Sequence, residues 1–339
     1  MMGRAEICVP SSDLSKPGKV ALITGIGGQD GGYLSEQLIA DGHVVWGMYR
    51  GGPAAAERLC SLPWLANVRL VEGDLRDRQS LEHVFSIANP DEVYNLASVS
   101  RPALAWNDPE SVAEANALGP LRLLELIRNA NRPIRFCQAS TSEMFGVDEP
   151  NPQNELTPIR PSGPYGAAKA YAHQMTGQFR NRYGLFACGA ILYNHESSRR
   201  PEDFVTRKIT RGAARIKLGK QDMLSLGNLN SRRDWGFAPD YVRALRLMLR
   251  ADQPNDYVVG TGILHTVGDI VEIAFARLGL DPKALVTLDP AFAHNGSPHG
   301  LVANAARARD ELGWTPSISF ETMIEQMVDD DLAAYSATS

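Results

Sequence analysis

The sequence lacks any long uninterrupted apolar stretch. No segment of its 339 residues approaches the roughly 20 consecutive apolar residues that a transmembrane helix needs, so no membrane partner is expected. Residues 1–18 also lack the apolar core of a signal peptide, and Pro10 and Pro17 interrupt them. We expect this segment to be a flexible leader and the protein to be cytoplasmic.

Cysteine is scarce, and neither sign of charge is concentrated. The four cysteines have no C-x-x-C spacing and the seven histidines no metal-ligand spacing, so no metal site or redox pair is expected. Cys8, Cys60, Cys137 and Cys188 are instead predicted to be small buried side chains in a reducing compartment. The 34 Lys and Arg are interspersed with 39 Asp and Glu, which argues against nucleic acid as a partner.

What the sequence does contain is a regular alternation of strand and helix patterns. Residues 19–24 form a short β-branched run, residues 33–39 carry an apolar stripe at helical spacing, and residues 44–48 return to strand character. The pattern continues with predicted strands 68–71, 92–97, 134–139 and 185–193 and predicted helices 79–88, 112–131 and 165–183. This alternation predicts an α/β fold with a Rossmann-type, doubly wound parallel sheet.

The alternation weakens after about residue 193. Residues 239–250 and 267–278 still read as helices, but strand signals become faint. We therefore predict an NADP-binding Rossmann domain over residues 19–193. Residues 194–339 are predicted to form mainly a smaller α/β substrate-binding lobe, some segments of which return to the first domain.

A glycine-rich turn follows the first predicted strand. Gly25, Gly28 and Gly31 have G-x-x-G-x-x-G spacing between a strand and a helix. Glycines at such a place let the backbone approach a pyrophosphate at a helix N-terminus, where free N–H groups favour negative charge. A tight turn alone also needs glycine, but the position after the first strand favours dinucleotide binding.

Two charged residues follow the next strands. Arg50 ends the second strand, where NAD-binding folds usually have an acid, so it is placed to pair with the 2′-phosphate of NADP; a solvated surface arginine is the alternative. Asp74 follows the third strand and is placed to hydrogen-bond the adenine, or else to cap a helix. These features favour NADP, with NAD as the alternative.

Tyr165 and Lys169 stand at i and i+4 of a predicted helix and so share one face. A neighbouring ammonium favours the phenolate, so we expect Lys169 to lower the pKa of Tyr165 toward that of a general base. Thr141 ends the adjacent predicted strand and is placed to hydrogen-bond the substrate oxygen. Glu143 supplies a carboxylate suited to removing a proton next to a transient ketone, unless it is only a capping or surface acid.

These motifs resemble those of the extended short-chain dehydrogenase/reductases and, within them, the GDP-mannose 4,6-dehydratase family. The resemblance runs from about Lys19 to Asp331. It rests on residues 24–31, 138–143, 164–169, 194–197, 204–209 and 233–236.

The resemblance implies an internal redox dehydration of a nucleotide sugar. Tyr165, assisted by Lys169 and Thr141, would take the C4 hydroxyl proton as hydride passes to NADP. Glu143 would then remove the C5 proton, water would leave from C6, and hydride would return to C6. Ser142 stands where related dTDP-glucose dehydratases carry an acid, so Glu143 would serve as both base and acid.

The resemblance also implies two sets of binding residues. The cofactor set is Gly25, Gly28, Gln29, Asp30, Gly31, Arg50, Asp74, Leu75, Leu96, Tyr165, Lys169, His195 and Arg200. The substrate set is Ser98, Asn194, Val205, Lys208, Gly227, Arg233 and His294, with Arg233 suited to the diphosphate.

The chain departs from the family pattern in two places. Residues 293–297 replace an Arg-Pro-x-Glu segment that grips the diphosphate and ribose, and residues 51–56 replace a polar run used in tetramer assembly. By resemblance a homodimer or homotetramer is expected, through helices 112–131 and 165–183.

The leading hypothesis is therefore a 4,6-dehydratase acting on GDP-mannose or a related GDP-linked sugar. The alternative is an NAD(P)-dependent 4-epimerase of a GDP-linked hexose, heptose or octose, which would need only Thr141, Tyr165 and Lys169. A third hypothesis is a non-catalytic NADP-binding regulator, although its expected sign, a broken Thr/Tyr/Lys set, is missing from this sequence.

Overall fold

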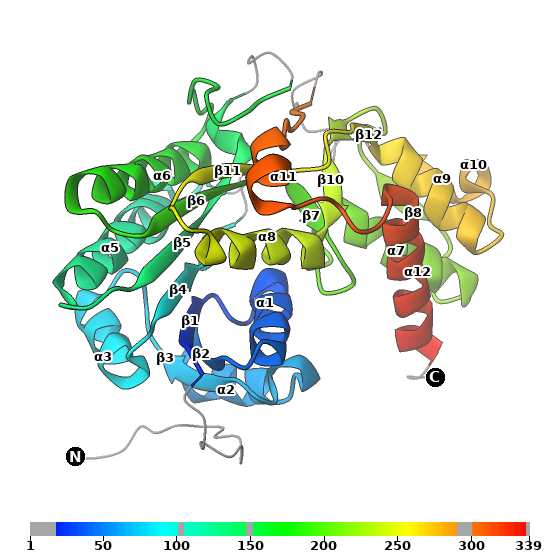
Figure 1. The fold of residues 1–339 in the computed structure, drawn as a ribbon. Helices are drawn as coiled ribbons and strands as arrows, with labels where there is room; N and C mark the ends of the chain where they lie inside the picture. Colours follow the sequence, from blue (N-terminus) through cyan, green and yellow to red (C-terminus); the bar gives the residue numbers. More distant parts are fainter. Residues whose placement is uncertain (1–17, 101–104, 147–151, 290–299, 337–339) are drawn as a thin grey trace.

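The short apolar runs form the strands of one parallel sheet. The computed structural model describes residues 18–100, 105–146, 152–289 and 300–336 (Figure 1). Its seven-stranded sheet has the order β11-β6-β5-β4-β1-β2-β3, which confirms the predicted doubly wound α/β fold. The strands are β1 (Val20–Thr24), β2 (Val44–Tyr49), β3 (Arg69–Glu72), β4 (Glu92–Asn95), β5 (Arg135–Thr141), β6 (Ala187–Leu192) and β11 (Asp256–Val259).

Successive side chains of a strand point to opposite faces of the sheet, and in these strands the side chains on both faces are mostly apolar. Helices therefore cover both faces. Leu22 of β1 packs in a cluster with α3 (Arg78–Ala88) and α5 (Gly119–Asn129). Its neighbours Ala21 and Ile23 pack in a second cluster with α1 (Gln29–Ala40) and α8 (Ala238–Arg250). The longest helix, α6 (Pro164–Tyr183), lies against β5 and β6.

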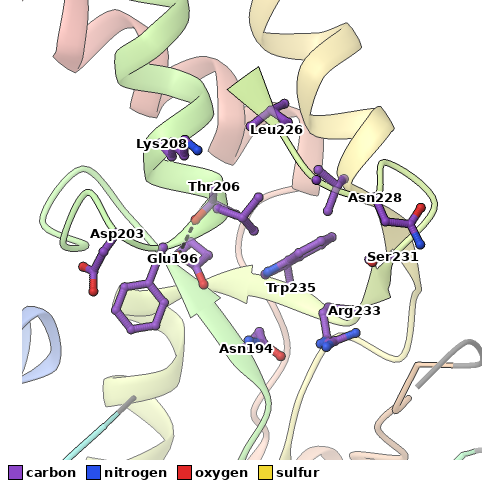
Figure 2. A pocket seen from close by; sticks show the side chains of 14 residues that line it. Asn194, Glu196, Asp203, Thr206, Lys208, Leu226, Asn228, Ser231, Arg233 and Trp235 are labelled. Carbon is purple, nitrogen blue, oxygen red and sulfur yellow. Dashed lines mark hydrogen bonds between the residues drawn. The ribbon is translucent and has the colours of Figure 1, made fainter. Parts of the chain in front are cut away.

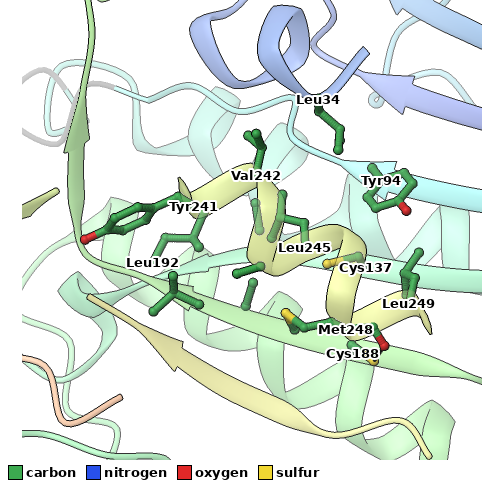
Figure 3. Close-up of a cluster of buried hydrophobic side chains, with 14 of the residues drawn as sticks. Leu34, Tyr94, Cys137, Cys188, Leu192, Tyr241, Val242, Leu245, Met248 and Leu249 are labelled. Carbon is green, nitrogen blue, oxygen red and sulfur yellow. Dashed lines mark hydrogen bonds between the residues drawn. The ribbon is translucent and has the colours of Figure 1, made fainter. Parts of the chain in front are cut away.

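Residues beyond 193 contribute directly to this core. Figure 3 shows Leu245 and Met248 of α8 on the side of Cys137 and Cys188, and Val242 on the side of Leu34 of α1. Cys137 and Cys188, neighbours on β5 and β6, are free and fully buried beneath this helix. Strand β11 then extends the sheet beside β6.

A second cluster of elements forms a smaller lobe. The core of this lobe lies among helices α7, α9 and α12. Three two-stranded pairs complete it: β7 with β10, β8 with β13, and β9 with β12. The helices of the lobe are α7 (Val205–Lys217), α9 (Val267–Arg277), α10 (Pro282–Leu285) and α12 (Phe320–Ser336), whereas α11 (Ala306–Leu312) packs on α8 and β11 of the central sheet. The strands are β7 (Asn194–Glu196), β8 (Leu224–Leu226), β9 (Arg232–Arg233), β10 (Trp235–Phe237), β12 (His265–Thr266) and β13 (Val286–Leu288).

Two expectations differ from the structure, and a third falls outside the described residues. The single helix predicted over 112–131 is instead α4 (Pro109–Ala113), a π-helical turn (Glu114–Leu118) and α5. Pro120 lacks the N–H that a regular α-helix would need there, which accounts for the wider turn. Cys60 is only partly buried and is disulfide-bonded, so the prediction of a buried thiol is wrong for this residue. The leader residues 1–17, including Cys8, lie outside the described residues.

None of the described helices has the length and apolar character that crossing a membrane requires.

A buried carboxylate forms hydrogen bonds with several side chains at the edge of the sheet where the strands begin. Glu92 at the start of β4 is 3% exposed and accepts hydrogen bonds from Lys19 Nζ at 3.0 Å and the Tyr94 hydroxyl at 2.9 Å. His43 Nε2 lies 3.5 Å from it. Burial alone would raise the pKa of Glu92, but these partners outweigh burial and lower the pKa to about 2.

We expect Glu92→Gln to reduce the free energy of unfolding at neutral pH by about 1–3 kcal/mol. Because the pKa falls from an ordinary 4.5 to about 2 on folding, the contribution of Glu92 is present above pH 4.5 and is lost as the pH falls toward 2. Urea unfolding, followed by circular dichroism at several pH values, should show a steeper acid loss for wild type than for Glu92→Gln. The exposed Glu82→Gln on α3 is the matched control, and equal acid slopes in all three proteins would contradict the assignment.

Candidate active site

The glycine turn after β1 lies in close contact with the neighbouring backbone. Gly25 has φ of +74°, and a Cβ on it would lie 2.8 Å from the backbone of Ala97. A Cβ on Gly31, in the first turn of α1, would lie 2.7 Å from the Gly25 carbonyl oxygen. Glycine is therefore required at both positions by the close approach of neighbouring backbone, and this packing places the turn and the N-terminus of α1 beside the pocket that Gly25 and Gly28 line.

A pocket opens between this turn and the ends of β2 and β3. Arg50 and Asp74 face each other across it, with Arg50 Nη1 3.7 Å from Asp74 Oδ2. Asp74 does not cap a helix, since Asp77 caps α3. Arg76 Nη2 donates a hydrogen bond to Asp74 Oδ2 at 2.7 Å, and this hydrogen bond lowers the pKa of Asp74. Residues lining the pocket include Gly25, Gly28, Met48, Arg50, Arg58, Asp74, Leu75, Ser98 and Val99.

A second pocket collects the predicted catalytic side chains. Thr141 ends β5, Glu143 lies in the following 3₁₀ turn (Ser142–Met144), and Tyr165 begins α6. The Thr141 hydroxyl accepts a hydrogen bond from the Glu143 N–H at 3.3 Å. Lining residues include Asp30, Leu96, Ser98, Thr141, Ser142, Glu143, Tyr165, Lys169, Asn194, His195, Arg200 and Phe204. Ser98, predicted to bind substrate, thus lies in both this pocket and the first.

Lys169 does not lower the pKa of Tyr165, so that expectation is wrong. Its ammonium donates to the Ala139 carbonyl at 2.9 Å, on the neighbouring strand, and is 3% exposed. Burial, followed by the charge of Glu143, raises the pKa of Tyr165 to about 12, although Arg200 and hydrogen bonds from neighbouring hydroxyl groups oppose the rise. Burial also lowers the pKa of Lys169 to about 8.

His195 and Asp30 form an ion pair beside the catalytic side chains. The Nε2 atom of His195 lies 2.9 Å from Asp30 Oδ2, and its Nδ1 donates to the Tyr193 carbonyl at 2.7 Å. Burial would lower the pKa of His195, but Asp30 outweighs burial and raises it. Gln29 donates to the His195 carbonyl at 3.1 Å, so the predicted cofactor residues Gln29, Asp30 and His195 form one connected group.

A third pocket lies in the smaller lobe (Figure 2). Figure 2 shows Asn194 and Arg233 on one side of Trp235, and Lys208 and Thr206 on the other. Five of the predicted substrate residues line it: Asn194, Val205, Lys208, Gly227 and Arg233. His294 lies outside the described residues. Asn194 and Phe204 also line the catalytic pocket, so the two pockets adjoin.

Several pocket residues were not singled out from the sequence. Glu196 on β7 is 1% exposed, and its carboxylate accepts from the Thr206 hydroxyl at 2.6 Å and lies 3.3 Å from Arg200 Nε. Arg200 also stacks on the Phe204 ring at 3.6 Å. Glu196 belongs to the quoted motif 194–197, but nothing in the sequence alone shows that it is buried between two pockets. Among the described residues, no group of three or more His, Cys, Asp or Glu is arranged to hold a metal ion.

Comparison with solved structures shows that the fold is shared with nucleotide-sugar enzymes of known structure. The UDP-glucose 4-epimerase of Thermus thermophilus, in complex with NAD, superposes with a TM-score of 0.80 at 26% identity, covering 93% of this chain and 99% of that chain. RMD from Pseudomonas aeruginosa, complexed with NADPH, superposes with a TM-score of 0.78 at 22% identity, covering 93% and 99%. Both solved structures share the fold of this chain over almost its whole length.

Comparison with known sequences is more specific. GDP-mannose 4,6 dehydratase 1 of Arabidopsis thaliana is 46% identical over 332 residues, covering 95% of this chain and 92% of that protein. The GDP-mannose 4,6 dehydratase of Homo sapiens is 38% identical, covering 94% and 93%. The family model described as GDP-mannose 4,6 dehydratase matches residues 22–327. A match over nearly the whole described fold, including all three pockets, means that this chain belongs to the GDP-mannose 4,6-dehydratase family.

Proposed function

We propose that this protein is an NADP-dependent hydro-lyase that converts GDP-mannose, or a closely related GDP-linked sugar, to its 4-keto-6-deoxy product. The similarity to GDP-mannose 4,6-dehydratases over more than nine-tenths of the chain supports the substrate class. Arg50 at the end of β2, lining the pocket beside the glycine turn, supports NADP over NAD.

One observation carries the choice of reaction. Glu143 and Tyr165 line the same pocket, and the carboxylate is close enough to raise the pKa of the phenol. Two bases side by side suit a reaction that removes protons from adjacent positions, the C4 hydroxyl and C5. A 4-epimerase has no use for the second base.

Each residue then has one task. A nicotinamide cofactor held at the glycine turn supplies a reversible hydride acceptor for C4 and C6. Tyr165 takes the C4 hydroxyl proton while the Thr141 hydroxyl orients that oxygen. Glu143 removes the C5 proton, made acidic by the C4 ketone, and passes it to the C6 hydroxyl, which leaves as water. When hydride is delivered to C6, the proton that Tyr165 took from the C4 hydroxyl is given to C5, so that both bases return to their starting states. Lys169 holds a positive charge beneath the phenol.

The adjoining pocket suits the nucleotide. Asn194 and Phe204 line both pockets, so a sugar beside Tyr165 would lead its diphosphate toward Arg233. The guanidinium of Arg233 is oriented by its bond to the Arg232 carbonyl at 2.7 Å. An arginine fork matches a phosphate group, and the buried Trp235 offers an apolar wall for the nucleoside.

We expect Glu143→Gln to reduce dehydration of GDP-mannose by about 10²-fold or more, because the C5 proton loses its base. Mass spectrometry of a mixture with NADP and GDP-mannose would detect the product, which is lighter by one water. Equal affinity for NADP in the variant would exclude misfolding as the cause. Dehydration at the wild-type rate by Glu143→Gln would disprove this role, and an isomer of unchanged mass from the wild type would indicate the epimerase.

We expect the deprotonation of Lys169 to make the reaction rate fall above about pH 8. Because the pKa of Lys169 is about 8, its ammonium is present below that pH and is lost above it, together with the positive charge that it places 5.9 Å from the centre of the Tyr165 ring. We expect kcat for wild type to fall above about pH 8, and Lys169→Met to be slower and to lack that fall. Rates measured at saturating substrate from about pH 6 to about pH 10 test this; an unchanged fall in the variant would assign it to another group.

Arg233→Ala should weaken GDP binding by about tenfold or more, because a charged hydrogen-bond partner of the diphosphate is lost. The neighbouring Arg232, which is exposed and does not line the pocket, supplies the matched control Arg232→Ala. Isothermal titration calorimetry with GDP should separate the two. Equal affinity in both variants would place the diphosphate elsewhere.

A further inference from the structure

The pocket beside the glycine turn is lined by two arginines, of which the sequence analysis identified one. Arg50 comes from the end of β2 and Arg58 from α2 (Gly52–Cys60), a helix that the sequence analysis does not predict. The lining also includes apolar side chains, among them Leu75 and Val99, which suit a flat base.

The packing of α2 determines where Arg58 lies. Gly51 and Gly52 turn the chain with φ of +115° and +68°, and the helix then runs back toward the cofactor turn. Leu59, 4% exposed, packs so closely on Gly27 that a Cβ there would lie 2.7 Å from the Leu59 side chain. This contact holds Arg58, the preceding residue, at the rim of the pocket.

The charges around the pocket leave both arginines available for an anion. Asp74 is engaged by Arg76 at 2.7 Å and lies at the longer distance of 3.7 Å from Arg50. Within the described residues, no carboxylate pairs with Arg58. Two exposed arginines and one acidic residue, Asp74, line the described part of this pocket, and Asp74 is already bonded to Arg76, so the lining carries a net positive charge.

We propose that Arg58 and Arg50 together clamp the 2′-phosphate of NADP, and that Arg58 is a determinant of the preference for NADP over NAD. The inference rests on the proposed cofactor and goes beyond it by assigning a residue on α2. A phosphate dianion has three acceptor oxygens, enough for two guanidinium groups approaching from a strand end and from a helix. NAD carries a hydroxyl at this position and gains nothing from either charge.

The test is the affinity for NADP⁺ and NAD⁺, measured by isothermal titration calorimetry on the full chain. Arg58→Ala should weaken NADP⁺ binding by about ten- to a hundredfold and change NAD⁺ binding by less than about twofold. Arg50→Ala should do the same. The control is Arg182→Ala, which removes an exposed arginine near the far end of α6 and should alter neither affinity.

Three outcomes would overturn the proposal. Equal losses for NADP⁺ and NAD⁺ in Arg58→Ala would mean that Arg58 only supports α2, and an unchanged NADP⁺ affinity would mean that it makes no contact. A wild type that prefers NAD⁺ would remove the basis of both the clamp and the NADP assignment. Arg58→Gln, which keeps most of the side chain, repeats the test if Arg58→Ala does not fold. Dehydration of GDP-mannose at saturating NADP, assayed in the same variants, tests the proposed reaction separately.

Discussion

The hydrogen bond from the Lys169 ammonium to the Ala139 carbonyl joins the two elements on which the catalytic pocket depends. Burying an ammonium is costly unless it is hydrogen-bonded, so this bond fixes α6 against the end of β5. Tyr165 lies one turn earlier on α6, and Thr141 two residues further along β5. Helix α6, which carries Tyr165, is thereby held in register with strand β5, which carries Thr141.

The three pockets follow from a parallel sheet whose strands all end at one edge. Ser98 lines both the pocket beside the glycine turn and the pocket that contains Tyr165. Asn194 and Phe204 line both the Tyr165 pocket and the pocket of the smaller lobe. Charges buried along this edge are paired: His195 with Asp30, and Arg200 with Glu196. Such pairs keep polar side chains rigid around ligands without leaving an uncompensated buried charge.

Most of the central sheet could be predicted because its signal is local. Six of the seven strands were expected as apolar runs separated by helical patterns, and the i, i+4 spacing of Tyr165 and Lys169 placed both on one face of α6. Strand β11 was missed because it has four residues and pairs with β6, which lies far earlier in the chain. Helix α2 was missed because Gly51, Gly52 and Pro53 look like a break, although proline is well tolerated in a first helical turn.

The sequence by itself determined the α/β class, the glycine turn at a helix N-terminus, and the residues from which the catalytic pocket is built, because spacing along the chain encodes each of them. Only the tertiary structure decided the ionisation of the pocket: Tyr165 has a raised pKa and Lys169 a lowered one, since burial and through-space charges, not spacing, set these values. It also brought Arg58 beside Arg50 and buried Glu196 between two pockets. Such contacts depend on how helices pack on the sheet, which no local pattern in the sequence specifies.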